Sequence, residues 1–131
     1  MTLTLPEVAE IAHAKGDPLI VDAAAELTPR SNFKRFLGES ADIVTCSGGK
    51  AIGGPLASGI LACRASLITS VAPQHKDVDV PAVTWNKRQL LAEGLDQVVP
   101  HQEFGRLITV DCEAVIGLFT ALKRYAAGSD K

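Results

Sequence analysis

The sequence feature that most constrains the fold is a pair of short apolar runs on either side of a glycine-rich stretch. The first run is Ile43–Cys46 and the second is Ile60–Cys63. The connection between them, residues 47–59, is called the glycine loop; it holds a single lysine, Lys50, close to four of its glycines (48, 49, 53 and 54), and it shows no helical periodicity. A parallel crossover normally contains a helix, so we expect two strands joined by a loop or an antiparallel return.

The other segments carry alternating helix and strand signals. Thr4 and Glu7 form a capping box that begins a helix ending before Gly16. The run Leu19–Asp22 is short and apolar up to its terminal acid, which is typical of a strand buried on both faces of a parallel sheet. The remaining expected elements are short helices at 33–38 and 65–71, a helix at 84–94 and a short strand at 105–110. This order predicts an α/β layer.

A last helix is the clearest single signal in the chain. Asp111 is its expected N-cap, and Gly128 stands just past its end. We expect this helix to bury the apolar face formed by Cys112, Val115, Ile116, Phe119 and Leu122.

The composition is that of one soluble globular domain. Of 131 residues, 47% are hydrophobic and 21% are charged, and the formal net charge is -2. No basic run marks a nucleic-acid surface and no window approaches the roughly 20 apolar residues of a membrane span, so we expect a cytoplasmic protein with neither partner. The three cysteines are expected to be buried free thiols, and no metal site is expected, because His75, Asp77 and Asp79 are interpreted as a polar surface loop.

Two side chains suggest chemistry when they are taken together. Asp22 ends one expected strand and Lys50 follows the next. Ligands of α/β sheets bind beyond the carboxyl ends of the strands, so these side chains would converge if the two strands are parallel neighbours. A lysine amine can form a Schiff base and a carboxylate can hold a pyridine nitrogen protonated, as pyridoxal phosphate requires. Ser47 and the N–H groups of the glycines are candidate phosphate donors.

Simpler interpretations stay open at this point. An Asp that ends a strand is usually a turn or cap residue, and a glycine-rich turn with one lysine is more often a solvated loop than an active site. A nucleotide-binding P-loop is set aside because Lys50 is followed by Ala51 and the required glycine spacing is absent.

Three segments, residues 21–27, 41–55 and 58–61, carry a resemblance to a known family. They resemble the large-domain core of fold-type-I pyridoxal-phosphate enzymes. The group they look most like is the selenocysteine-synthase-like family, which includes L-seryl-tRNA(Sec) selenium transferase and D-glucosaminate-6-phosphate ammonia-lyase. The resemblance continues through Gln74–Asp79, Thr84–Trp85 and Phe104–Val110.

This resemblance implies a role for each matching residue near the cofactor, pyridoxal 5′-phosphate. Lys50 would form the Schiff base, or internal aldimine, and Asp22 would pair with the pyridinium nitrogen. Ala24 would lie against the ring face. Ser47 would lie close to the phosphate or to the Schiff base.

The resemblance also implies a wider organisation. Gly53 and Gly54 would form a turn near the cofactor phosphate of the other subunit, and Arg106 would hold an anionic substrate. Residues 1–100 match part of the cofactor-binding large domain, with a mixed, mostly parallel sheet. Residues 101–131 match the linker strand and the helix that lead towards the small domain. The expected assembly is a homodimer or a higher homo-oligomer.

The function that the resemblance implies is a lyase or transferase acting on an amino acid or an amino sugar acid. Members of this family are several hundred residues long, so we expect a partial enzyme. Two alternatives stay open. One is a non-catalytic fragment that acts by self-association, and the other is a small phosphate-binding α/β protein that uses the glycine loop without a covalent step.

Overall fold

The computed structural model describes residues 2–71, 74 and 110–128. The chain divides into two compact units, one of which combines Met1–Arg64 with Val110–Lys131. The other unit, Ala65–Thr109, is described only for helix α3 (Ala65–Val71) and for Gln74. Apart from Val110, the features expected at 75–83, 84–94 and 105–110 lie outside the described residues, as does the boundary expected after residue 100.

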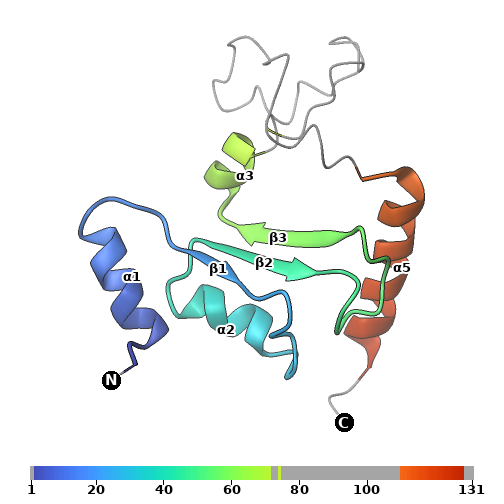
Figure 1. Cartoon of the computed structure of the whole chain (residues 1–131), viewed down its shortest axis with the longest axis horizontal. Coiled ribbons are helices and arrows are strands. Elements are labelled where there is room, and N and C mark those ends of the chain that lie inside the picture. The colour runs from blue at the N-terminus through green and yellow to red at the C-terminus, as the bar shows by residue number, and fades with distance from the viewer. Residues whose placement is uncertain (1, 72–73, 75–109, 129–131) are drawn as a thin grey trace. The chain divides into compact units, whose positions relative to one another are not determined.

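A mixed sheet of three strands forms the centre of the first unit (Figure 1). Its order is β1 (Ile20–Asp22), β2 (Ile43–Ser47) and β3 (Gly59–Cys63). β1 is parallel to β2, whereas β2 and β3 are antiparallel and are joined through the glycine-rich stretch. The sheet confirms both the α/β prediction and the antiparallel return.

Three described helices belong to the first unit, and local sequence signals explain where the first and the last of them begin. α1 (Leu5–His13) starts at the expected capping box, in which the N–H and the hydroxyl of Thr4 each donate to Glu7 over 2.7 Å. α2 spans Asn32–Gly38. α5 (Cys112–Ala127) starts where the N–H of Ala114 donates to the Asp111 carboxylate over 2.6 Å. The sequence predicted all three helices.

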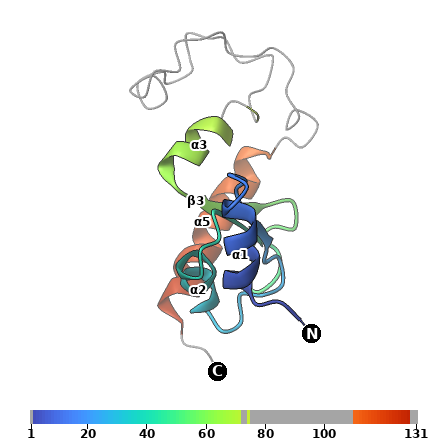
Figure 2. The same ribbon diagram turned by 90° about the vertical axis from the view of Figure 1, so that its left-hand side faces the viewer.

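The core joins both parts of the first unit. Leu27 and Val44 are its largest fully buried side chains, and Ala121 of α5 belongs to the same cluster. Figure 1 shows α5 beside the loop that joins β2 to β3, and Figure 2 views the same ribbon with α1 in front. The other buried members of the cluster are Ala23, Phe36, Ala41, Cys46 and Ile52.

The prediction that the first strand is buried on both faces is wrong. Ile20 of β1 is 61% exposed, Val21 is half-buried and Asp22 is exposed. In the described part of the chain β1 pairs with β2 alone, and the side chain of Ile20 lies mostly in solvent. β1 is therefore an edge strand of the described sheet, with one side turned to the core.

The prediction for the buried face of the last helix is also wrong. Ile116 and Phe119 are 66% and 62% exposed, whereas Ala114 and Ala121 are buried. Of the residues expected inside, only Leu122 packs against the core. The reason lies in the close approach of the glycine loop, which the small side chains of α5 permit and large ones would prevent.

Candidate functional site

The carboxyl ends of β1 and β2 lie at the same edge of the sheet. The two strands are parallel, with Asp22 opposite Thr45, and the N–H of Ala23 donates to the carbonyl of Thr45 over 2.8 Å. Asp22 is the last residue of β1, and Lys50 follows the end of β2. The condition under which these two residues would converge, parallel neighbouring strands, is therefore met.

Asp22 is held in a turn just beyond β1. Its Oδ1 accepts the N–H of Ala24 over 2.9 Å, the geometry of a local Asp turn. Burial, and then the negative charge of Asp22, raise the pKa of the Cys46 thiol. Asp22 thus acts electrostatically on the end of β2, while its own side chain remains exposed to solvent.

The glycine loop is closed by its own backbone hydrogen bonds. Gly48 donates to the carbonyl of Ser58 over 2.9 Å, Gly53 to that of Lys50 over 2.9 Å, and Gly54 to that of Gly48 over 2.7 Å. These three N–H groups are already engaged and are not available as phosphate donors, contrary to the expectation from the sequence.

The glycines of the loop are explained by close packing. A Cβ at Gly48 would clash with Ser58 Oγ and lie 2.8 Å from Leu118 Cδ1, and one at Gly49 would lie 2.7 Å from the Cα of Leu56. Gly53 has φ +72°, in the left-handed region that favours glycine. The loop is therefore compact and presents the exposed side chain of Lys50 on a tightly bonded turn.

The other expected site residues are placed as follows. Ala24 and Ser47 are half-buried, at the carboxyl ends of β1 and β2. Gly54 packs against α5, where an added Cβ would lie 3.3 Å from that of Ala121. Arg106 lies outside the described residues.

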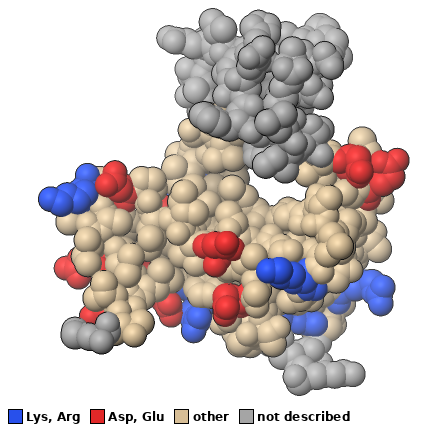
Figure 3. Space-filling model, in the orientation of Figure 1, with Lys and Arg blue, Asp and Glu red and all other residues tan. Residues whose placement is uncertain are grey.

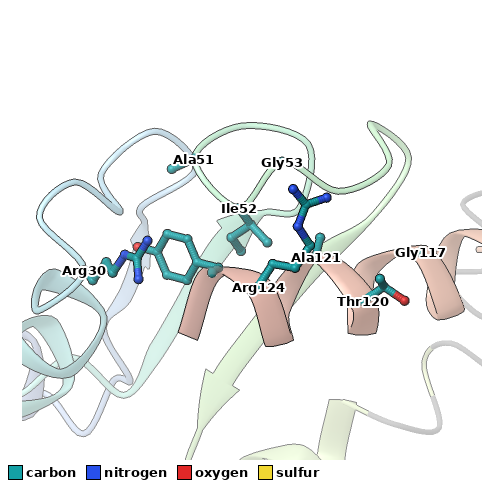
Figure 4. A pocket seen from close by; sticks show the side chains of 9 residues that line it. Arg30, Ala51, Ile52, Gly53, Gly117, Thr120, Ala121 and Arg124 are labelled. Atoms are coloured by element: carbon teal, nitrogen blue, oxygen red, sulfur yellow. The ribbon is translucent and has the colours of Figure 1, made fainter. Parts of the chain in front are cut away.

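A pocket of about 550 Å³ lies between the glycine loop and α5 (Figure 4). Arg30 and Arg124 lie at this pocket, and Gly53 is the expected site residue that lines it. No sequence pattern indicates either arginine, because they are distant in the sequence and belong to no motif. The other lining residues are Ala51, Ile52, Gly117, Thr120, Ala121 and Tyr125.

A separate polar cluster surrounds Asp42, which is buried just before β2. Asp42 accepts the N–H of Leu19 over 2.9 Å, its Oδ2 lies 2.6 Å from His13 Nε2, and it forms an ion pair with Arg64. The Leu19 hydrogen bond, followed by the contact with His13, lowers the pKa of Asp42. His13 therefore has a structural partner in addition to its position at the end of α1.

No group of three or more His, Cys, Asp or Glu side chains suitable for a metal occurs in the described ranges. Acidic and basic groups are scattered over the face shown in Figure 3.

All three cysteines are free, as expected, but Cys63 is only half-buried and Cys112 is exposed. Among the described helices, none has the length and apolar character needed to cross a membrane.

Comparisons with known proteins find similarity between this α/β chain and parts of known enzymes. A solved D-glucosaminate-6-phosphate ammonia-lyase matches 98% of the chain with TM-score 0.62 and 27% identity, and the chain covers 26% of that structure. D-glucosaminate-6-phosphate ammonia lyase of Salmonella typhimurium (strain 14028s / SGSC 2262) is 34% identical over 76 residues, or 58% of this chain. No protein-family profile matches the chain.

A second curated relative is 5′-C-glycyluridine monooxygenase-decarboxylase of a Streptomyces species, which is 34% identical over 77 residues, or 59% of this chain. The chain spans 19% and 18% of the lengths of these two curated relatives. These matches confirm the resemblance found in the sequence: the chain is related to the selenocysteine-synthase-like family through its D-glucosaminate-6-phosphate ammonia-lyase member.

Proposed function

We propose that this chain carries the cofactor-anchoring core of a fold-type-I pyridoxal-phosphate lyase or transferase, acting on an amino acid or an amino sugar acid. The observation that carries the proposal is the parallel pairing of β1 with β2, since Asp22 ends the first strand and Lys50 stands three residues past the end of the second. The relationship to an ammonia-lyase supports the same reaction class.

The side chains at this edge suit the chemistry of pyridoxal phosphate. When bound, this cofactor supplies an aldehyde carbon and an electron sink. Lys50 offers an exposed primary amine that can bond covalently to a carbonyl carbon. Asp22 keeps Oδ2 for a ring nitrogen, since Oδ1 already accepts the Ala24 N–H. Ala24 would flank the ring and Ser47 would offer a hydroxyl at the end of β2.

The role proposed for Lys50 in turnover is proton transfer. Its Nζ can take a proton from the α-carbon of the substrate and return one to the product. The tightly bonded loop would fix the backbone position from which the Lys50 side chain reaches the substrate. The phosphate needs donors other than Gly48, Gly53 and Gly54, whose N–H groups are engaged inside the loop.

The decisive experiment is borohydride reduction of the protein mixed with pyridoxal phosphate, followed by peptide mass spectrometry. We expect a reduced adduct on Lys50 at substoichiometric cofactor, because among the described lysines it alone follows a strand whose parallel neighbour ends in a carboxylate. Lys50→Ala should abolish it. Lys34→Ala, at an exposed position on α2, is the matched control and should leave it unchanged. Labelling spread equally over all lysines would overturn the proposal.

We further propose that the chain associates with a second copy of itself. Ile116 and Phe119, both exposed, form an apolar patch on the outer face of α5, and Val115 lies beside them with 42% exposure. This is the observation that favours self-association, whether or not the chain is catalytic.

A further inference from the structure

We propose that two copies of the chain pair through the outer faces of their α5 helices, antiparallel, with a two-fold axis beside Phe119. The inference rests on the self-association proposed above and adds the arrangement of the two copies. It is independent of cofactor binding, because it uses neither Asp22 nor Lys50. The partner is a second copy of this chain, to which a two-fold axis presents the same surface.

The outer face of α5 carries a strip of side chains that runs along the helix. Cys112, Ile116, Phe119 and Lys123 follow one another at spacings of three or four residues, so they lie on one side of the helix. All four are exposed, Ile116 by 66% and Phe119 by 62%. Two large apolar side chains therefore stand in solvent in the middle of this outer strip, where burial against a second copy would stabilise a pair.

The inner face of α5 is committed to the core of the first unit. Ala121 belongs to the core cluster, and the Tyr125 hydroxyl donates to the carbonyl of Leu27 over 2.5 Å. A Cβ at Gly117 would lie 2.8 Å from Cγ of Pro55, so the helix and the glycine loop are in close contact there. The helix thus presents the outer strip from a fixed support, which lowers the entropic cost of association.

The charges of α5 decide the direction in which two such helices pair. The first turn carries the acid Glu113, and the last turns carry Lys123, on the outer strip, and Arg124. A parallel pair would bring Lys123 next to the partner's Lys123, whereas an antiparallel pair puts the acidic end of one helix beside the basic end of the other. The helix dipoles favour the same direction. Exposed charge pairs contribute little free energy, so they set the direction while the apolar contact supplies the affinity.

The length of α5 fixes which residues meet. Phe119 and Thr120 are the middle residues of Cys112–Ala127, so aligning the ends of two antiparallel helices brings the two Phe119 rings beside the two-fold axis. Aromatic rings gain by packing on each other as well as by leaving water. In the same register Ile116 meets the partner's Lys123, whose methylene stem covers it while the amine stays in water. The antiparallel register therefore covers the apolar side chains of the outer strip without burying a charge.

The test is cross-linking with a short bis-maleimide, at a protein concentration where sedimentation shows association. The native chain carries the exposed thiol of Cys112 at one end of α5, and the double variant Cys112→Ser/Thr120→Cys carries it at the middle. In the antiparallel pair the two thiols at position 120 are neighbours, whereas two Cys112 thiols are about 22 Å apart along the helix axis. Both chains keep Cys46 and Cys63, so cross-links through these positions are common to both. We expect at least about fivefold more cross-linked dimer from the double variant.

The control for the interface is Phe119→Ser added to the double variant. It should lower the yield of cross-linked dimer at least about fivefold, with an unchanged circular dichroism spectrum. Equal yields from the native chain and the double variant would overturn the antiparallel direction. Association without cross-linking of either chain would overturn the use of α5, and a chain that stays monomeric would show that something other than a second copy covers this face. Lys50→Ala should leave all of these yields unchanged, so a failure of the proposed cofactor attachment is measured separately.

Discussion

Asp42 is a buried carboxylate on which three segments of the first unit converge. It accepts from the backbone at the start of β1, contacts His13 at the end of α1 and pairs with Arg64 after β3. Because a charged acceptor is favoured by these donors, the pKa of Asp42 lies below its usual 3.8. One side chain therefore links the position of α1 to the sheet.

Loss of this carboxylate should lower the free energy of unfolding in a pH-dependent way. The unfolded chain binds a proton at Asp42 more readily than the folded protein, so the stabilisation is present above pH 3.8 and lost as the pH falls through the lower folded pKa. Asp42→Ala should cost about 1.5–3 kcal/mol at neutral pH. Urea unfolding at several pH values would show a smaller acid-induced loss in Asp42→Ala than in the native chain. Asp17→Asn, at an exposed position, is the control, and an identical pH dependence for Asp42→Ala would contradict the argument.

Gly48 provides a second test at the scale of one residue. Gly48→Ala should destabilise the protein by about 1–3 kcal/mol, because the added Cβ would lie 2.8 Å from Leu118 Cδ1 and 3.0 Å from the carbonyl oxygen of Ser58. Gly38→Ala is the matched control: nothing lies within 4 Å of its Cβ, at the end of α2, so its effect should be neutral or slightly stabilising. Equal effects of the two substitutions in urea unfolding would contradict the packing explanation.

The sequence predicts the role of a single residue when the partners of that residue are close to it in the chain. The Thr4–Glu7 capping box and the Asp111 cap are formed by neighbours in the chain, and both are confirmed. Arg30 and Arg124 come to one pocket only through the packing of α5 on the loop. No spacing or composition rule predicts such a pair, because the determinant is tertiary.

At the scale of elements, the strands and helices of the described residues were predictable and their burial was not. Short apolar runs and turn residues locate β1, β2 and β3, since those signals are intrinsic to the segments. α5 is apolar over most of its circumference, so periodicity alone does not decide which arc is buried. The arc with Ala114, Gly117 and Ala121 is selected because backbone of the glycine loop and Pro55 approach it closely.

The glycine loop is a second element whose contacts the sequence did not predict. Its glycines suggested a cradle for phosphate, yet Gly48, Gly49 and Gly54 are required by contacts with Ser58, Leu56 and α5. Only Gly53 combines a positive φ with a place at the pocket. A glycine-rich pattern thus predicts that other atoms approach the backbone closely. Only the structure shows that these atoms belong to the protein's own chain and not to a ligand.

At the scale of the whole molecule, the apolar patch on α5 decides how copies of the chain behave. We expect Phe119→Ser to shift the sedimentation coefficient towards the monomer value, because it removes an exposed ring from the proposed interface. The free energy of unfolding of the monomer should change by less than about 0.5 kcal/mol. Glu113→Ser, at an exposed position on α5, should leave self-association unchanged. Identical sedimentation of the Phe119→Ser and native chains would contradict a role for this patch.

The bond between Tyr125 and Leu27 joins positions 98 residues apart. During synthesis, Leu27 and Ile52 therefore leave the ribosome long before Ala121 and Tyr125 exist to pack against them. The nascent chain must carry an open apolar surface until α5 emerges, and chaperones have that interval in which to bind it.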